Sequence, residues 1–320
     1  MTTSGDYMVD RRRLRRKLSL WRIGAIGAGL VAALLVAAKL GGVDSLDKST
    51  PHVARLTIEG MITGDQDTLQ LVKDIRESKA SAVLLDIDSP GGTTTGAEML
   101  YLELRKLAEK KPVVAVVRNV AASGAYIAAI GADEIFVRGN SMVGSIGVLA
   151  EIHNLYKTLD MVGVKVESFK SSPLKNAPNN FEPTSDAARA AIAALIDDSY
   201  VWFKGLVKER RKLSDAELAK ISDGRVFTGR QALPLKLADA IGGESEAVEW
   251  LETNKNLPKK LPIRDWKKKT TLEHAGLLGM ASAGARAAGL PILAALLEGA
   301  RGGGEKLDGL LAIWQGPGAF

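Results

Sequence analysis

The stretch Val113-Val-Ala-Val-Val-Arg-Asn-Val-Ala-Ala-Ser-Gly-Ala-Tyr-Ile-Ala-Ala129 decides the fold class of this chain. Its first five residues form a Val-rich run that is typical of a buried parallel strand. The Ala-rich residues after Ser123 predict a helix, so this serine lies at a sharp strand-to-helix turn. Backbone N–H groups at the start of a helix lack intrahelical acceptors, and they could hold an oxyanion beside a serine nucleophile. The alternative is that Ser123 only caps the helix.

Predicted strands and helices alternate on both sides of this turn. The strands are expected at 53–58, 82–88, 113–117, 134–137, 147–152 and 164–169. The helices are expected at 68–78, 97–109, 124–130, 153–162 and 185–212, with further helices to residue 251. This alternation predicts an α/β fold with a mainly parallel sheet. Ligands of such sheets bind beyond the carboxyl ends of the strands, where we expect both Ser123 and a glycine turn at Asp88-Ser-Pro-Gly-Gly92.

Composition excludes several classes of function. The 320 residues suffice for one large or two small domains and include no cysteine. Disulfides, thiolate zinc sites and a cysteine nucleophile are therefore excluded. The net charge of +6 resides in residues 1–40, which hold eight basic and two acidic side chains. The remaining residues are neutral in sum, so we expect no nucleic-acid partner.

An apolar segment follows the basic cluster near the N-terminus. Residues 23–38 carry no charge, and the flanking Arg22 and Lys39 can extend the span to the length that a bilayer needs. The positive-inside rule places residues 1–17 in the cytoplasm, 18–40 in the membrane as an anchor, and the remainder outside the cytoplasm. A cleaved signal peptide is the alternative, and it gives the same compartment for the body of the protein.

Two further segments flank the alternating region. Residues 41–52 form a short polar stalk. Residues 253–320 combine a Lys- and Pro-rich linker with a tail rich in Ala, Gly and Leu. We expect the tail to be helical and to lie at a membrane surface or in an oligomer contact, with a mobile tail as the alternative.

A serine nucleophile needs a base. The chain has only three histidines, His52, His153 and His274, and none lies in a glycine-rich or strand-end context. A Ser-His-Asp triad is therefore poorly supported.

A lysine can act as the base when burial keeps it uncharged. Lys175 is the best candidate because it follows a predicted strand, in the loop Phe169-Lys-Ser-Ser-Pro-Leu-Lys-Asn-Ala-Pro178, among small and apolar neighbours. Ser145, in the tight segment Gly144-Ser-Ile-Gly147, could hold the lysine amine. An ordinary turn serine is the alternative for Ser145.

Five motifs, in order, resemble those of the signal peptide peptidase A family, which are membrane-anchored serine–lysine proteases related in fold to the Clp protease and crotonase superfamily. The motifs are Asp86-Ile-Asp-Ser-Pro-Gly-Gly92, Ala121-Ala-Ser-Gly-Ala-Tyr-Ile-Ala128, Gly144-Ser-Ile-Gly-Val148, Ser171-Ser-Pro-Leu-Lys175 and Gly224-Arg-Val-Phe-Thr-Gly-Arg-Gln-Ala232. The resemblance implies Clp-protease/crotonase-like repeated ββα units with a mainly parallel sheet, preceded by one N-terminal transmembrane helix. The helical tail expected beyond Leu272 lies outside the resemblance. Residues 53–252 would form the peptidase domain.

The resemblance also implies the chemistry of the site. Ser123 would be the nucleophile, Lys175 the general base and Ser145 the residue that orients the lysine. The backbone of Gly91, Gly92 and Gly124 would form the oxyanion hole. The family forms an acyl-enzyme without a metal or a cofactor.

Substrate, assembly and location are implied in the same way. The substrates would be remnant signal peptides and other apolar, unstructured peptides. We expect a homo-oligomeric ring that is anchored by a single span in the inner (plasma) membrane, with its N-terminus cytoplasmic and its catalytic domain in the periplasm.

Two positions depart from the family pattern. Asn176 stands where an Asp often follows the base lysine, and Ala125 stands where an aromatic residue or Gly is common. Neither change removes a reacting group. Two other functions would use the same fold: a crotonase-type acyl-CoA enzyme, which predicts acidic catalytic residues near the glycine turns, and an inactive membrane scaffold.

Overall fold

The computed structural model describes residues 17, 21, 24, 48–268 and 311–313. Most of the predicted anchor and most of the tail lie outside the described residues. Among the residues that are described, no helix combines the length and the apolarity required to cross a membrane. The chain divides between Thr50 and Pro51 into two units, and every element discussed below belongs to the second.

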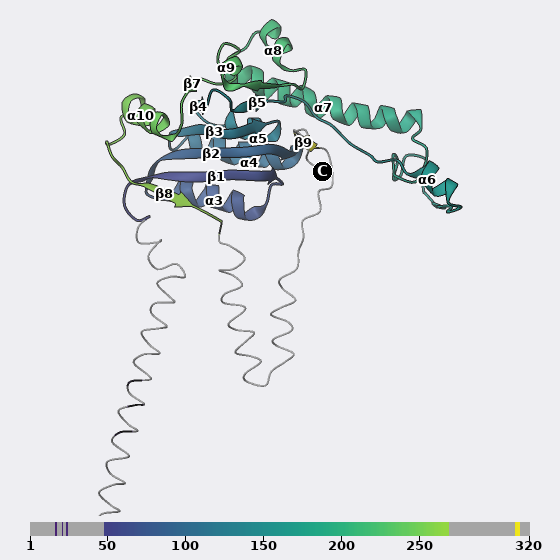
Figure 1. The fold of residues 1–320 in the computed structure, drawn as a ribbon, viewed down its shortest axis with the longest axis horizontal. Helices are drawn as coiled ribbons and strands as arrows, with labels where there is room; N and C mark the ends of the chain where they lie inside the picture. The colour runs from purple at the N-terminus through teal and green to yellow at the C-terminus, as the bar shows by residue number, and fades with distance from the viewer. Residues whose placement is uncertain (1–16, 18–20, 22–23, 25–47, 269–310, 314–320) are drawn as a thin grey trace, which may run out of the picture. The chain divides into compact units, whose positions relative to one another are not determined.

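A single sheet forms the centre of this unit (Figure 1). Its strands are β1 (His52–Ile62), β2 (Ala80–Thr93), β3 (Val113–Ala122), β4 (Glu134–Val137), β5 (Met142–Gly144), β6 (Val226–Thr228), β7 (Ala240–Ile241), β8 (Ile263–Trp266) and β9 (Leu311–Ile313). The main path is β6-β5-β3-β2-β1-β8, with β4 beside β3, β7 beside β4 and β9 beside β2. Only the pairs β2–β9 and β5–β6 are antiparallel in the described sheet. The predicted α/β class with a mainly parallel sheet is confirmed.

Helices cover both faces of the sheet. They are α3 (Gln66–Glu77), α4 (Thr94–Ala108), α5 (Gly124–Ala129), α6 (Tyr156–Met161), α7 (Asp186–Arg211), α8 (Asp215–Ile221), α9 (Gly229–Ala232) and α10 (Glu244–Asn254). Successive residues of β2 enter different cores: Leu85 packs in the large core that includes α3, α4 and α5, and Leu84 packs in the smaller core with α10. Burial on both faces explains the unbroken apolar runs of the central strands.

β2 is longer than the sequence predicts. The expected turn at residues 88–92 instead continues this strand, with Met61 of β1 opposite Gly91 and Ile62 opposite Gly92. A Cβ atom at position 92 would lie 1.9 Å from the Ile62 carbonyl oxygen. Gly92 therefore permits the close approach of β1, a packing role that the sequence pattern does not reveal.

The chain after β5 differs most from prediction. The strands predicted at 147–152 and 164–169 do not form, and the helix predicted at 153–162 shortens to α6. No residue from Glu151 to Ala187 is buried. We call residues 151–185 the arm. In Figure 1, α6 and the loop that joins it to α7 lie at the start of α7, away from β3 and α5.

β8 lies within the segment predicted to be a linker. It pairs in parallel with β1, from Val53 opposite Ile263 to Leu56 opposite Trp266. His52, which the sequence places in the stalk, is fully buried, and its Nε2 accepts a hydrogen bond of 3.1 Å from Trp266 Nε1. The start of β1 is thus fixed to the sheet by a residue 214 positions later in the chain.

Candidate active site

Ser123 lies directly between β3 and α5, at the carboxyl end of a central strand. Its backbone adopts φ 54° and ψ −118°, and only 1% of the residue is exposed. The hydroxyl makes no capping hydrogen bond to α5, so helix capping does not explain the serine. A non-glycine residue in this region of φ/ψ space costs on the order of 1–3 kcal/mol, and such strain is characteristic of functional sites.

The surrounding backbone fixes this strained turn. The Ser123 N–H donates to the Gly144 carbonyl at 2.7 Å, and the Ser123 carbonyl accepts from Tyr126 and Ile127. Gly124 and Ala125, at the first positions of α5, have N–H groups that no carbonyl within the helix can reach. These groups lie directly after the end of β3 and Ser123, which is a suitable place for an oxyanion.

Ser145 lies close to this turn. Ala122 pairs with Gly144 across β3 and β5, so the two residues that follow them, Ser123 and Ser145, leave neighbouring strand ends. Ser145 also has a positive φ, 52°, and is 7% exposed. Its N–H donates to the Arg225 carbonyl at 2.8 Å, which holds this loop against the residue before β6.

Gly91 and Gly92 lie on β2, just past the point where β3 leaves it. Ser89 is opposite Ala121, two residues before Ser123. The Gly91 N–H donates to Ser89 Oγ at 3.2 Å, and this hydroxyl donates to the Gly60 carbonyl at 2.6 Å. The Gly91 N–H that the resemblance assigns to an oxyanion therefore already has an acceptor.

Lys175 is not beside Ser123 in the single chain. It is exposed on the arm, where its backbone N–H donates to the Ser172 carbonyl. The arm is held by its own contacts, such as the ion pair of Lys170 with Glu182 and a hydrogen bond of 2.7 Å from Leu155 N to the Asn180 carbonyl. A lysine base must be buried to stay uncharged, and the chain itself does not bury Lys175.

The two described histidines offer no substitute for the lysine. His52 begins β1 at the amino end of the sheet, whereas Ser123 follows the carboxyl end of the parallel strand β3. His153 is exposed on the arm beside Glu151. Within the described ranges, no group of three or more His, Cys, Asp or Glu side chains could hold a metal ion.

Charged side chains line the exposed part of the sheet face that does not carry α5. Arg118 of β3 contacts Glu59 and Asp86, and Arg55 of β1 contacts Glu244 at 2.6 Å. Burial raises the pKa of Asp86, although Arg118 and Arg55 oppose this effect. The sequence gives no signal for this network, because its members are scattered over four elements.

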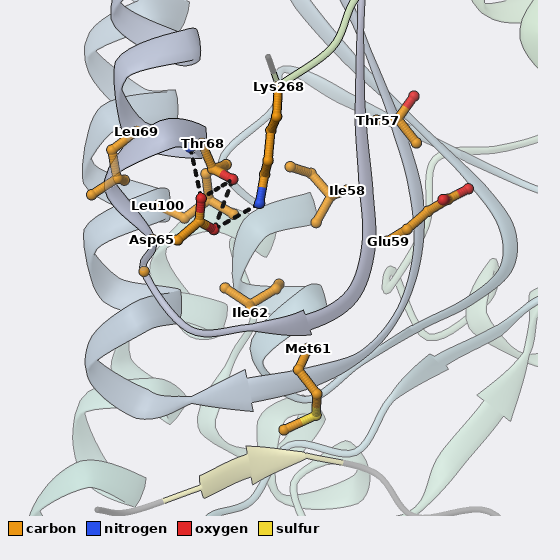
Figure 2. Close-up of a pocket in the computed structure, with 11 residues that line it drawn as sticks. Thr57, Ile58, Glu59, Met61, Ile62, Asp65, Thr68, Leu69, Leu100 and Lys268 are labelled. Atoms are coloured by element: carbon orange, nitrogen blue, oxygen red, sulfur yellow. Dashed lines mark hydrogen bonds and ion pairs between the residues drawn. The ribbon is translucent and has the colours of Figure 1, made fainter. Parts of the chain in front are cut away.

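A small cavity between β1, α3 and α4 is structural rather than catalytic. Figure 2 shows Lys268 reaching Asp65, whose carboxylate also caps α3 through Thr68. Burial opposes ionisation of Asp65, but hydrogen bonds from Lys268 and Thr68 outweigh it and lower the pKa of this carboxyl group. The cavity volume of about 40 Å³ has room for a few water molecules.

Comparison with known proteins places this chain among peptidases. The family described as "Peptidase family S49" matches residues 105–258, which include Ser123, Ser145 and Lys175. The Synechocystis sp. protein named "Putative protease slr0021" is 36% identical over 214 residues, covering 66% of this chain and 77% of that protein. "Serine protease SPPA, chloroplastic" of Arabidopsis thaliana is 28% identical over 260 residues, covering 78% of this chain and 36% of that protein.

Two further similarities are found. "Protease 4" of Salmonella typhi is 31% identical over 191 residues, covering 59% of this chain and 31% of that protein. A solved structure of a mutant of the "1510-N membrane-bound stomatin-specific protease" has 16% identity and a TM-score of 0.44, covering 68% of this chain and 98% of that one.

The fold and the sequence matches together define a serine peptidase, a hydrolase. The chain belongs to peptidase family S49, the signal peptide peptidase A family.

Proposed function

We propose that this chain is a membrane-bound endopeptidase that cuts apolar, unstructured peptides, including signal peptides left in the membrane. Ser123 is the nucleophile and Lys175 is the base. The observation that carries this proposal is the strained, buried backbone of Ser123 at the first N–H groups of α5. The crotonase alternative finds no support in the family match.

The reaction follows from these groups. Ser123 Oγ bonds to the peptide carbonyl carbon while its proton passes to the uncharged Nζ of Lys175. The N–H groups at the start of α5 hold the carbonyl oxygen as it becomes negative. Lys175 then gives its proton to the leaving amine, and a water, deprotonated by the same amine, hydrolyses the acyl-enzyme. In this proposal, Ser145 holds the lysine amine by a hydrogen bond.

Lys175 reaches Ser123 from a neighbouring copy in this proposal. The arm exposes nine large apolar side chains, among them Met161 at 84% and Phe169 at 96%. Apolar surface of this extent on a short segment favours contact with another protein surface. A second copy that covers the arm would supply the burial that keeps the lysine amine uncharged. Repetition of this head-to-tail contact closes a ring.

A fluorophosphonate probe on the purified full-length protein tests the nucleophile. We expect labelling at Ser123 and none in Ser123→Ala. Ser123→Ala and Lys175→Ala should each lower cleavage of a fluorogenic apolar peptide by about 10³-fold or more. Lys165→Ala removes another exposed lysine of the arm and should retain activity. Because only an unprotonated amine can accept the serine proton, the rate should rise toward alkaline pH.

Mixing the two inactive variants tests whether the base comes from a neighbour. If the variants are dissociated and reassembled together at equal amounts, about a quarter of the sites pair an intact Ser123 with an intact Lys175 of another copy. We expect the mixture to regain about this share of wild-type activity. An inactive mixture would refute the shared site, and activity of Ser123→Ala alone would refute the proposed function.

A further inference from the structure

β3 changes its neighbouring strand just before the Ser123 turn. Residues 114–117 pair with β4, whereas residues 120–122 pair with β5 on the same edge of β3 (Figure 1). Residues 118–119 lie between the two paired segments. The change of strand brings β5 beside the turn, where the Ser123 N–H donates to the Gly144 carbonyl. The backbone at 118–119 therefore sets where the turn lies relative to β5.

The same part of β3 bulges away from β2. Val117 lies opposite Ile87, and the next pair is Ala121 opposite Ser89. Three residues of β3 thus face the single residue Asp88 of β2. Two extra residues keep the later side chains on their original faces of the sheet, because side chains alternate with a period of two. Bulges interrupt the ladder, bend the strand and often lie next to active sites, where they re-aim a side chain.

The Asp88 side chain holds this bulge. One carboxylate oxygen accepts a hydrogen bond of 2.7 Å from Asn119 Nδ2, and the other accepts one of 3.3 Å from the Val120 N–H. Asp88 is half-buried and Asn119 is exposed. A side chain of β2 thus supplies an acceptor to the backbone at the point where the bulge interrupts the ladder.

Ser141, between β4 and β5, holds the bulge from the other side. Its buried hydroxyl lies within donating distance of the Arg118 carbonyl, at 2.7 Å, and of the Val117 carbonyl, at 3.0 Å. The same hydroxyl accepts a hydrogen bond of 3.0 Å from the Arg138 N–H. Of the two supports, the half-buried Asp88 is the one that can be altered without opening a cavity in the core.

We propose that Asp88 is a positioning residue for the peptidase reaction, because its contacts with Asn119 and Val120 fix the bulge that aims the Ser123 turn. The inference rests on the proposed function, in which Ser123 is the nucleophile. A strained backbone such as that of Ser123 persists only when the surrounding structure determines it. A nucleophile misplaced by about 1 Å can lose on the order of 100-fold in rate.

Exchange of the two side chains tests the assignment. In Asp88→Asn, one of the two acceptor atoms becomes a donor, so one hydrogen bond is lost. In Asn119→Asp, two carboxylates face each other. The double variant, Asp88→Asn with Asn119→Asp, restores both hydrogen bonds at an unchanged net charge. Its amide at position 88 donates to the carboxylate at position 119, and the amide oxygen accepts from the Val120 N–H.

The readout is kcat for a fluorogenic apolar peptide. We expect each single variant to lower kcat by about 10–100-fold with KM unchanged, because the groups that contact substrate remain in place. The double variant should return kcat to within about threefold of wild type. Asp265→Asn is the matched control, since it makes the same acid-to-amide change at the ion pair with Arg55, away from the bulge, and should keep kcat. A residue that only stabilises the fold would change urea unfolding but leave kcat of the folded enzyme unaltered.

Each outcome decides the inference. Asn119→Ala serves where a charge-altering variant does not fold, because truncation of an exposed side chain costs little stability, and it should lower kcat at least about threefold. Wild-type kcat in the single variants, or no recovery in the folded double variant, would overturn the positioning role while Ser123→Ala remains inactive. Cleavage by Ser123→Ala would instead overturn the proposed function, and recovery in the double variant would still report the contact between positions 88 and 119.

Discussion

Replacement of Tyr126 by Phe probes the support beneath the Ser123 turn. Tyr126 lies in α5, three residues after the proposed nucleophile, and is fully buried. Its hydroxyl donates a hydrogen bond of 2.9 Å to the Leu237 carbonyl. Burial raises the pKa of Tyr126 well above its ordinary value, so the hydroxyl remains a donor over the pH range in which the protein can be studied.

The expected loss follows from this geometry. Tyr126→Phe keeps the ring and its packing but leaves the Leu237 carbonyl buried without this donor. A buried acceptor that loses its partner costs about 1–3 kcal/mol. For a folded unit of this size, each kcal/mol shifts Tm by about 2–4 °C. We therefore expect Tyr126→Phe to lower Tm by roughly 2–12 °C.

Urea unfolding of the full-length protein, at one fixed protein concentration, measures the loss in the free energy of unfolding, and thermal unfolding measures the change in Tm. Tyr101→Phe is the matched control, because Tyr101 is also buried in the large core but no hydrogen bond from its hydroxyl is found among the described residues. Its loss should stay within about 0.5 kcal/mol. Equal stability of the two variants would refute the assignment of a structural hydrogen bond to Tyr126.

Three further predictions concern stability. Gly92→Ala should cost about 1–3 kcal/mol or more in urea unfolding, because its Cβ atom would lie 1.9 Å from the Ile62 carbonyl oxygen. Gly205→Ala should instead stabilise by about 0.5–1 kcal/mol, since this exposed position of α7 has open space around it; a loss at this site would contradict the helix assignment. A hydrogen bond from Lys236 lowers the pKa of Glu217 from 4.5 to about 2, so charged Glu217 stabilises the fold above pH 4.5 and this contribution is lost as the pH falls toward 2. Glu217→Gln should flatten that part of a Tm-against-pH series, and an unaltered acid limb would exclude the contribution.

Much of the fold could be predicted because the pattern of apolar residues in the sequence matches their burial in the structure. The apolar runs of β2, β3 and β4 are buried on both faces, and the structure places strands at each of them. The long helix predicted at 185–212 is confirmed as α7 to within one residue at each end. In these segments local preference and tertiary packing select the same structure.

The predictions are wrong where contacts between distant segments determine the secondary structure. The glycine segment of β2 has the composition of a turn, yet β1 on one edge and β9 on the other keep it extended. β8 has four residues in a Lys- and Pro-rich context, and pairing with β1 alone makes it a strand. On the arm, apolar and polar residues alternate over most of 164–169, as in a strand, but this segment does not pair with the sheet.

The candidate site could likewise be predicted only in part. The strand-to-helix turn of Ser123 could be predicted from sequence because a Val-rich run and an Ala-rich run meet there. Its strained φ and the neighbouring positive φ of Ser145 depend on the β3–β5 pairing, which residue periodicity does not reveal. The exposed position of Lys175 on the arm could not be predicted either, because the strand expected before it does not form. Its role stays a prediction.

The direction of the strands separates the Ser123 turn from the point at which the chain enters β1. The N-terminal segment enters the sheet at His52, the amino end of β1, whereas Ser123 lies level with the carboxyl end of the same strand. At about 3.3 Å per residue, these two levels are on the order of 25–30 Å apart. A change to the chain immediately before His52 therefore acts on the end of the sheet that lies away from Ser123.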